Sequence, residues 1–304
     1  MSDHRVRMLM VLAALFWSGA FITGKLAVTE FPPFALTFFR FLLAVPFIFL
    51  LLYTRERDQW IPEKNQWLPL VILAFTGTFA YHAFFFSALQ YTTAINSSLI
   101  GSTNPMVTTL LAALFFQERL TWSRIAGIIF SFSGVFIVIT NADWNIIRTF
   151  HLNSGDLLMF IAVFCWAVYS LLGRRYMKEY SLSPVMVTAY TFLLCVIFSL
   201  PFVWWENPAS YLPYTTMKGW LSIFYMSFFA SVLGYLIQMV AIRKIGASRS
   251  AMFINLVPIF TIIQSITILG EAFSLYKLLG AGIIILGVYL AIRPEEEYSK
   301  VKAA

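Results

Sequence analysis

The stretch NPMVTTLLAALFFQERLTWSRIAGIIFSFSGVFIV, residues 104–138, holds two long apolar runs separated by one short polar break. The stretch VPIFTIIQSITILGEAFSLYKLLGAGIIILGVYL, residues 257–290, has the same layout, and its Pro258 follows Pro105 by 153 residues. Each run lies within a longer apolar stretch that is close to the ~20 residues that an α-helix needs to cross the hydrocarbon core of a bilayer. The two stretches therefore predict a helical membrane protein built from a repeated unit.

The composition of the whole chain agrees with lipid as its solvent. Of 304 residues, 60% are hydrophobic and 12% are charged, whereas about 25% are charged in an ordinary soluble domain. Cys165 and Cys195 both lie within apolar runs, so we expect neither a disulfide framework nor a metal site, and no cofactor. The net charge of +7 sits in short connections between apolar runs, so we expect no nucleic-acid partner.

We expect ten membrane-spanning helices with both termini in the cytoplasm. The ten apolar stretches are residues 8–27, 34–54, 67–89, 94–116, 122–140, 155–175, 185–205, 218–242, 247–270 and 275–293. With a cytoplasmic N-terminus, sixteen of the 21 Lys and Arg residues lie inside, four lie outside and Arg40 lies within a span. This asymmetry follows the positive-inside rule. It predicts a multi-pass protein of a bacterial plasma (inner) membrane.

The two halves of the chain align with each other. We expect a first five-helix unit at residues 8–140, a second at 155–293, and a cytoplasmic tail at 294–304. The aligned pairs at the offset of 153 residues are Trp67 and Trp220, Glu118 and Glu271, Gly127 and Gly280, and Gly134 and Gly287. Because five is an odd number of crossings, the second unit enters the membrane from the opposite side. Such inverted repeats are the architecture by which many secondary transporters achieve alternating access.

These motifs resemble the EamA-type repeat. Its features here are the proline within the fourth helix, the glutamate at the end of that helix and the two glycines seven residues apart in the fifth. The segments LFWSGAFITGKLA, residues 15–27, and FALTFFRFLLA, residues 34–44, resemble the first two helices of the repeat. The resemblance covers nearly the whole chain. It implies the drug/metabolite transporter superfamily, ten helices around a central cavity, and export of amino acids or other small metabolites.

Pro105 and Pro258 point to the middle of the protein as the site of transport. Each removes a helical hydrogen bond near the middle of its span, and such a break is tolerated in lipid where it is packed in protein or lines a cavity. Ser98, Ser102 and Asn255 add small polar groups beside the two prolines. Close helix packing is the alternative. We favour cavity lining because both halves combine a kink with a polar group.

Aromatic and hydrogen-bonding side chains in other spans are candidates for the remaining walls. They are Trp17, Tyr81, His82, Trp166, Tyr169, Tyr235 and Gln238. Such a cavity would suit an amphipathic solute, for example an aromatic or branched amino acid, although each aromatic could simply serve packing. His82 either relays a proton or, as a neutral ring, bonds a neighbouring helix.

Three charged residues are candidates for structural or gating roles. Arg40 lies well inside a span, where we favour an ion pair with Glu30 over attraction of a substrate carboxylate. Glu118 and Glu271 each stand just ahead of the next helix, where we expect them to cap its N-terminus; a gate contact is the alternative. The paired glycines of the fifth helices predict tight helix packing, within this chain or with a second protomer.

These features together favour an alternating-access exporter of a small metabolite, most of all an aromatic or other apolar amino acid. No carboxylate lies in the middle of a span, which favours facilitated export or coupling through His82 alone. A multidrug or organic-cation exporter is the alternative. A channel and an intramembrane enzyme are disfavoured, since the repeat predicts gates on both sides and no enzyme motif is present. The expected partners are the substrate and the lipid bilayer, with the chain as a monomer or homodimer.

Overall fold

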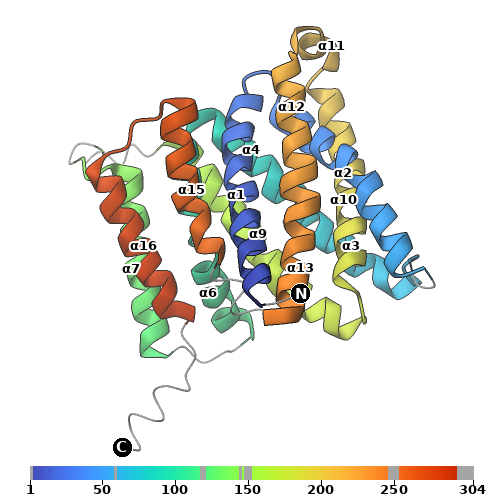
Figure 1. Ribbon diagram of the computed structural model, residues 1–304, viewed down its shortest axis with the longest axis horizontal. Coiled ribbons are helices and arrows are strands. Elements are labelled where there is room, and N and C mark those ends of the chain that lie inside the picture. The colour runs from blue at the N-terminus through green and yellow to red at the C-terminus, as the bar shows by residue number, and fades with distance from the viewer. Residues whose placement is uncertain are drawn as a thin grey trace, which may run out of the picture.

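All regular structure in the described part of the chain is helical (Figure 1). The computed structural model describes residues 3–57, 60–116, 121–143, 146, 153–245 and 253–292. Eight of the described helices are long and apolar enough to cross a membrane, and two shorter apolar helices cover Leu256–Leu269 and Leu275–Leu290. The chain is therefore an all-helical membrane protein.

The helical elements follow the predicted apolar stretches closely. The first half contains α1 (Asp3–Ala27), α2 (Pro33–Arg55), η1 (Lys64–Gln66), α3 (Trp67–Leu73), η2 (Ala74–Ala80), α4 (Tyr81–Tyr91), α5 (Ala94–Gly101), α6 (Asn104–Phe116) and α7 (Trp122–Thr140). The second half contains α9 (Ser154–Glu179), α10 (Pro184–Trp205), α11 (Pro208–Tyr211), η3 (Leu212–Tyr214), α12 (Met217–Tyr225), η4 (Met226–Leu233), α13 (Gly234–Ile245), η5 (Phe253–Asn255), α15 (Leu256–Gln264), η6 (Ser265–Leu269) and α16 (Leu275–Ile292).

Helices of the two halves pack on one another in matching pairs. The second and seventh predicted spans, α2 and α10, lie together at one edge of the molecule, and the fifth and tenth, α7 and α16, lie together at the other (Figure 1). Between these edges, α1 packs against α12, α13 and α15 of the second half, while α9 packs against α4, α5 and α6 of the first. Nearly every contact that a helix of the first half makes with the second half thus has a counterpart made by the matching helix of the second half.

Glycines bring α7 and α16 into backbone contact. A Cβ atom built on Gly134 would lie 2.7 Å from the carbonyl oxygen of Gly280, and one built on Gly287 would lie 2.6 Å from that of Gly127. Since any larger residue would force the helices apart, these positions require glycine. The prediction of tight packing is confirmed, and the partner is the other half of the same chain.

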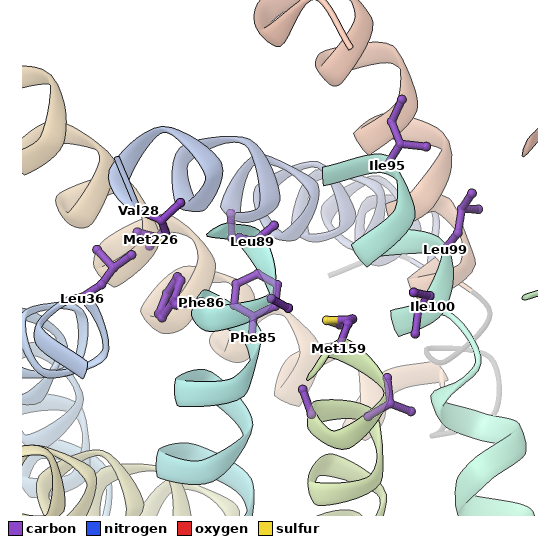
Figure 2. Packing of buried hydrophobic residues seen from close by; sticks show 14 of the residues in the cluster. Val28, Leu36, Phe85, Phe86, Leu89, Ile95, Leu99, Ile100, Met159 and Met226 are labelled. Atoms are coloured by element: carbon purple, nitrogen blue, oxygen red, sulfur yellow. The ribbon is translucent and has the colours of Figure 1, made fainter. Parts of the chain in front are cut away.

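Large apolar side chains fill the space between the central helices. Figure 2 shows Phe85, Phe86 and Leu89 of α4 close to Val28 and Leu36, with Met159 of α9 facing Ile100 of α5. Phe86, Leu89 and Met159 are fully buried. This cluster joins both halves and holds the helices that form the site described below.

Carboxylates cap helices across the boundary between the halves at one end of the bundle. We call this end, which carries α11 at the top of Figure 1, the Glu271 end. There the Glu271 carboxylate accepts hydrogen bonds from the backbone N–H groups of Ala94 (2.7 Å) and Ile95 (3.1 Å), at the start of α5. The expectation that Glu271 caps the following helix is therefore wrong. The start of α5 lies nearer to it in space, although it is 177 residues away in sequence.

Two more glutamates act in the same way at this end. Glu206 accepts from the backbone N–H groups of Phe34 (3.0 Å) and Ala35 (2.7 Å), at the start of α2. Burial raises the pKa of the Glu206 carboxyl, and these two N–H groups oppose that rise. Glu30 accepts from the backbone N–H (2.7 Å) and the hydroxyl (2.8 Å) of Thr216, ahead of α12. A carboxylate at a helix N-terminus satisfies free N–H groups and the helix dipole together.

Candidate functional site

The helical run of the fourth span is interrupted in its middle, as Pro105 predicts. α5 ends at Gly101 and α6 begins at Asn104, with Ser102 and Thr103 in a turn between them. In the second half the 3-10 turn η5 passes into α15 just ahead of Pro258. Both interruptions expose backbone and small side chains within the bundle, where only a cavity or protein packing tolerates them.

Two π-helical segments occupy matching places in the two halves. They are η2 (Ala74–Ala80) and η4 (Met226–Leu233), which coincide almost residue for residue at the offset of 153 residues. The wider turns leave carbonyl groups free for other partners, and the Ala230 carbonyl accepts a hydrogen bond of 3.0 Å from Nε1 of Trp17. The first π segment ends directly before Tyr81, and the second ends two residues before Tyr235, so each lies next to a tyrosine that lines the cavity described below.

A central cavity of about 230 Å³ lies where these interruptions meet. Its lining comes from both halves of the chain. It consists of Trp17, Ala20, Phe21, Arg40, Tyr81, His82, Phe85, Ser98, Gly101, Ser102, Asn104, Pro105, Val163, Trp166, Ala230, Tyr235, Gln238, Ile254, Val257 and Pro258. The volume is slightly below the 300–1,000 Å³ usual for ligand clefts, so the cavity suits a small solute.

Aromatic rings form much of the cavity wall. The ring of Tyr81 lies 4.9 Å from that of Trp166, and the ring of Phe21 lies 5.2 Å from that of Phe85 in an edge-to-face arrangement. Such contacts hold large apolar surfaces in fixed positions. This part of the wall can therefore receive a flat or branched apolar group.

Most of the small polar groups of the lining are bonded to their own helix. The hydroxyl of Ser98 donates to the Ile95 carbonyl (2.9 Å), and that of Ser102 donates to the Leu99 carbonyl (2.7 Å). Their oxygens still present lone pairs to the cavity. The two serines can thus accept hydrogen bonds from a solute but have no proton left to donate.

His82 lies between aromatic rings at the inner wall. Its Nδ1 is 2.7 Å from the Thr78 carbonyl oxygen one turn earlier, and its ring is 4.7 Å from those of both Phe41 and Tyr81. A nitrogen facing a carbonyl must carry a proton, so Nε2 is the acceptor whenever the ring is neutral. The bond is made within its own helix rather than to a neighbouring one.

Arg40 faces this cavity and does not pair with Glu30. Its Nε donates to the hydroxyl of Ser231 (3.1 Å), and its backbone carbonyl accepts from the hydroxyl of Ser227 (2.7 Å). Both oxygens of Glu30 are occupied by Thr216. The predicted ion pair is therefore wrong, because the N-terminus of α12 takes the carboxylate.

The structure places nearly all the predicted substrate-binding residues around one cavity. Tyr169 lies behind the wall, with its ring 5.2 Å from Trp166 and closely packed on Gly77 of η2. The backbone of Asn255 belongs to η5, but its side chain lies outside the described part of the structure, as does all of Glu118.

Several lining residues escaped the sequence analysis. Asn104 donates from Nδ2 to the Val163 carbonyl (3.4 Å) and accepts from the Thr108 hydroxyl (3.1 Å). The available signal was a polar residue directly before a proline in the middle of a span. Phe21 and Phe85 carried no such signal, because 18% of the chain is aromatic.

Comparison with known proteins agrees with this arrangement. A sequence model described as the EamA-like transporter family matches twice, at residues 5–140 and 153–293. The chain belongs to the EamA-like transporter family. It is thus an EamA-type member of the drug/metabolite transporter superfamily, and the family indicates a transporter rather than an enzyme.

Relatives of this EamA-type chain extend over its full length. It is 33% identical to an uncharacterized transporter, YyaM, of Bacillus subtilis, over 91% of this chain and 90% of the relative. It is 31% identical to an uncharacterized transporter of Archaeoglobus fulgidus, over 97% and 100%. A probable amino-acid metabolite efflux pump of Salmonella typhimurium is 27% identical over 93% of both chains.

A solved crystal structure shows that the fold of this EamA-type chain has a known counterpart. The TM-score is 0.64 over 95% of this chain and 97% of the other, at 19% sequence identity. At that identity the likeness concerns the fold alone.

Proposed function

We propose that this EamA-type transporter is an alternating-access carrier that exports a small metabolite, in particular an amino acid with an aromatic or other apolar side chain. The observation that carries the proposal is the central cavity of about 230 Å³, which both halves line at their helix interruptions. Its size and its aromatic walls with a few polar groups fit such a solute.

We further propose ten membrane-spanning helices in two inverted units, residues 8–140 and 155–293, with both termini in the cytoplasm. The family model matches once in each half. The reciprocal helix contacts support a two-fold relation between the halves, since α2 meets its mate α10 and α7 meets its mate α16. A carrier needs this relation because equivalent packing can then open to either side at similar energy.

This orientation places the Glu271 end on the outer side of a bacterial plasma membrane. The proposal is supported by the charge distribution, with sixteen of 21 Lys and Arg residues assigned to the cytoplasmic side. Three glutamates join the halves at the Glu271 end. We propose that these contacts keep the cavity closed toward the outer side of the membrane. The name of the Salmonella relative, which speaks of amino-acid metabolite efflux, supports the direction of transport.

The test is counterflow in proteoliposomes of the purified full chain, with labelled leucine and phenylalanine as probes. Ser102→Trp fills part of the cavity and takes volume that the solute needs. It should lower uptake on the order of tenfold or more, which corresponds to a loss of about 1.4 kcal/mol in binding. Ser133→Trp is the matched control, because Ser133 is exposed on the outside of α7. Equal uptake by both variants would contradict the assignment of the cavity. Single-channel currents from the wild type would contradict a carrier.

A further inference from the structure

Arg40 is a permanent charge in an unusual place. It is the eighth of the 23 residues of α2, only 7% of its surface is exposed, and it lines the central cavity. A charged side chain at membrane depth is costly, so it is kept where it meets a partner or serves a function. A guanidinium carries five N–H donors, and each of them calls for an acceptor.

The described residues supply few of the hydrogen-bond acceptors that the Arg40 guanidinium requires. Among the described residues, the hydroxyl of Ser231 is the one hydrogen-bond acceptor of its side chain. The rings of Phe41 and Phe86 lie 5.4 and 5.9 Å from its Cζ atom. These faces stabilise the cation weakly and offer no lone pair to the two terminal nitrogens.

The described surroundings of Arg40 also lack a carboxylate. The titratable groups that interact with it electrostatically are the side chains of Tyr81, Tyr235, Cys195 and His82. Among the described residues, no carboxylate pairs with Arg40. The cavity lining holds Arg40 as its one Lys or Arg and contains no Asp or Glu. The cavity is therefore an electropositive space with one unneutralised charge.

The neighbours of Arg40 in the cavity can complete an anion site. The hydroxyls of Tyr81 and Tyr235 make no hydrogen bond within the described structure, so each keeps a proton to donate. A guanidinium binds a carboxylate through two parallel hydrogen bonds. Beside this group of donors, the ring of Trp166 lies 4.9 Å from that of Tyr81. Together with Trp17, which also lines the cavity, it offers an apolar surface to the remainder of the solute.

We propose that Arg40 is the residue that selects the substrate of this carrier, by binding the carboxylate of a singly charged organic acid whose apolar part rests on the aromatic wall. The inference rests on the proposed carrier function and deepens it. One guanidinium balances one negative charge, so a carboxylate fits where a phosphate dianion leaves excess charge. Organic cations and polyamines, which lack a carboxylate, are poor substrates.

Three probes that differ at one group test the inference in proteoliposomes of the full chain. They are phenylalanine, 3-phenylpropanoate, which keeps the carboxylate and lacks the amine, and phenylalanine amide, which lacks the carboxylate charge. The wild type should exchange the two acids and discriminate against the amide on the order of ten- to hundredfold, the range expected for hydrogen bonds to a charged group.

Arg40→Gln should abolish this discrimination by slowing the acids and not the amide. Arg40→Lys, which keeps the charge and loses the planar fork, should fall between Arg40→Gln and the wild type. Arg55→Gln is the matched control, because Arg55 is an exposed residue at the end of the same helix. The ratio of acid to amide within one preparation does not depend on how much of a variant is folded.

The outcomes separate the two proposals. An unchanged ratio in Arg40→Gln, or equal transport of acid and amide by the wild type, overturns the role of Arg40 and leaves the carrier function standing. If Arg40→Gln does not fold, the ratio in Arg40→Lys decides, and a value equal to that of the wild type overturns the inference. Failure of the wild type to exchange any small solute overturns the carrier function itself.

Discussion

Single side chains in this protein act by satisfying polar groups that lipid cannot hydrate. The Trp17 indole of α1 is the clearest case, since its Nε1–H donates a hydrogen bond to the carbonyl of fully buried Ala230 in η4. Arg40 and Ser231 form a similar bridge between α2 and the same π segment. Each contact places a first-half side chain against an irregular part of the second half.

Removing the indole donor should destabilise the fold measurably. Trp17→Phe keeps an aromatic ring, although a smaller one, and leaves the Ala230 carbonyl without its partner, at a cost of about 1–3 kcal/mol. The measurement is the free energy of unfolding in detergent micelles. Trp122→Phe is the control, since Trp122 is 85% exposed and its replacement should change little. A loss of equal size in both variants would show that this hydrogen bond contributes no specific stability.

Sequence reasoning succeeded at this scale where a residue type has one physical role and failed where the partner lies far away in the chain. The proline breaks and glycine contacts follow from local sterics. The pair of Arg40 with Glu30 was expected because Glu30 lies at the outer end of the span that holds Arg40. However, hydropathy says nothing about Thr216 at the N-cap of α12, whose N–H and hydroxyl take Glu30 instead. No sequence pattern distinguishes Phe85, which lines the cavity, from the many aromatics that only pack.

At the scale of helices, two kinds of contact hold the structure together. Carboxylates cap helix N-termini, and helices pack closely along their glycine-containing faces. The glutamates of the Glu271 end serve α2, α5 and α12. Glycines let α7 and α16 touch through their backbones. Helix positions were predictable because apolar length sets them. The π segments were not, since their hydrogen-bond register changes without any change in hydropathy.

The cap on α5 should be sensitive to the charge of Glu271. Glu271→Gln keeps one acceptor oxygen but loses the charge that strengthens both hydrogen bonds, so we expect a loss of about 0.5–2 kcal/mol in the free energy of unfolding. Amide exchange at Ala94 and Ile95 should become faster. Glu179→Gln, at a side chain with 47% exposure, is the control. Unchanged exchange at residues 94–95 would contradict the cap.

The contact between α7 and α16 should tolerate no added methyl group. Gly134→Ala places a Cβ atom 2.7 Å from the Gly280 carbonyl oxygen and 2.9 Å from the backbone nitrogen of Ile284. Separating the helices should cost about 1–3 kcal/mol. Gly282→Ala on α16 has open space around it and should be neutral or slightly stabilising. Equal stability of the two variants, measured by unfolding in detergent, would rule out the close contact as a stabilising feature.

At the scale of the whole molecule, neither half is complete alone. α2 and α5 of the first half take their caps from Glu206 and Glu271 of the second, and α12 takes its cap from Glu30 of the first. The cavity wall is shared in the same way. The repeat in the sequence indicated two similar units, but it did not reveal how far each depends on the other.

Separately expressed halves should therefore be stable only together. Residues 1–149 and 150–304 produced in the same cell should co-purify and regain exchange activity. Either half alone should be degraded or should aggregate. The measurement is co-purification through a tag on one half, with the intact chain as the reference. Isolation of one half as a stable, monodisperse five-helix monomer would contradict this expectation.

The cross-half caps also impose a one-sided constraint on how the sequence can change over evolution. Glu206 and Glu271 bind backbone N–H groups, which every residue except proline provides. The caps therefore ask nothing of the donor side chains except that they not be proline, and fully buried Ala94 and Ile95 are restricted by core packing alone. The glutamates, by contrast, cannot be replaced without loss. In a set of descendants of this protein, we expect invariant acids opposite apolar positions that change independently of them, with no compensating substitution to reveal that the two positions touch.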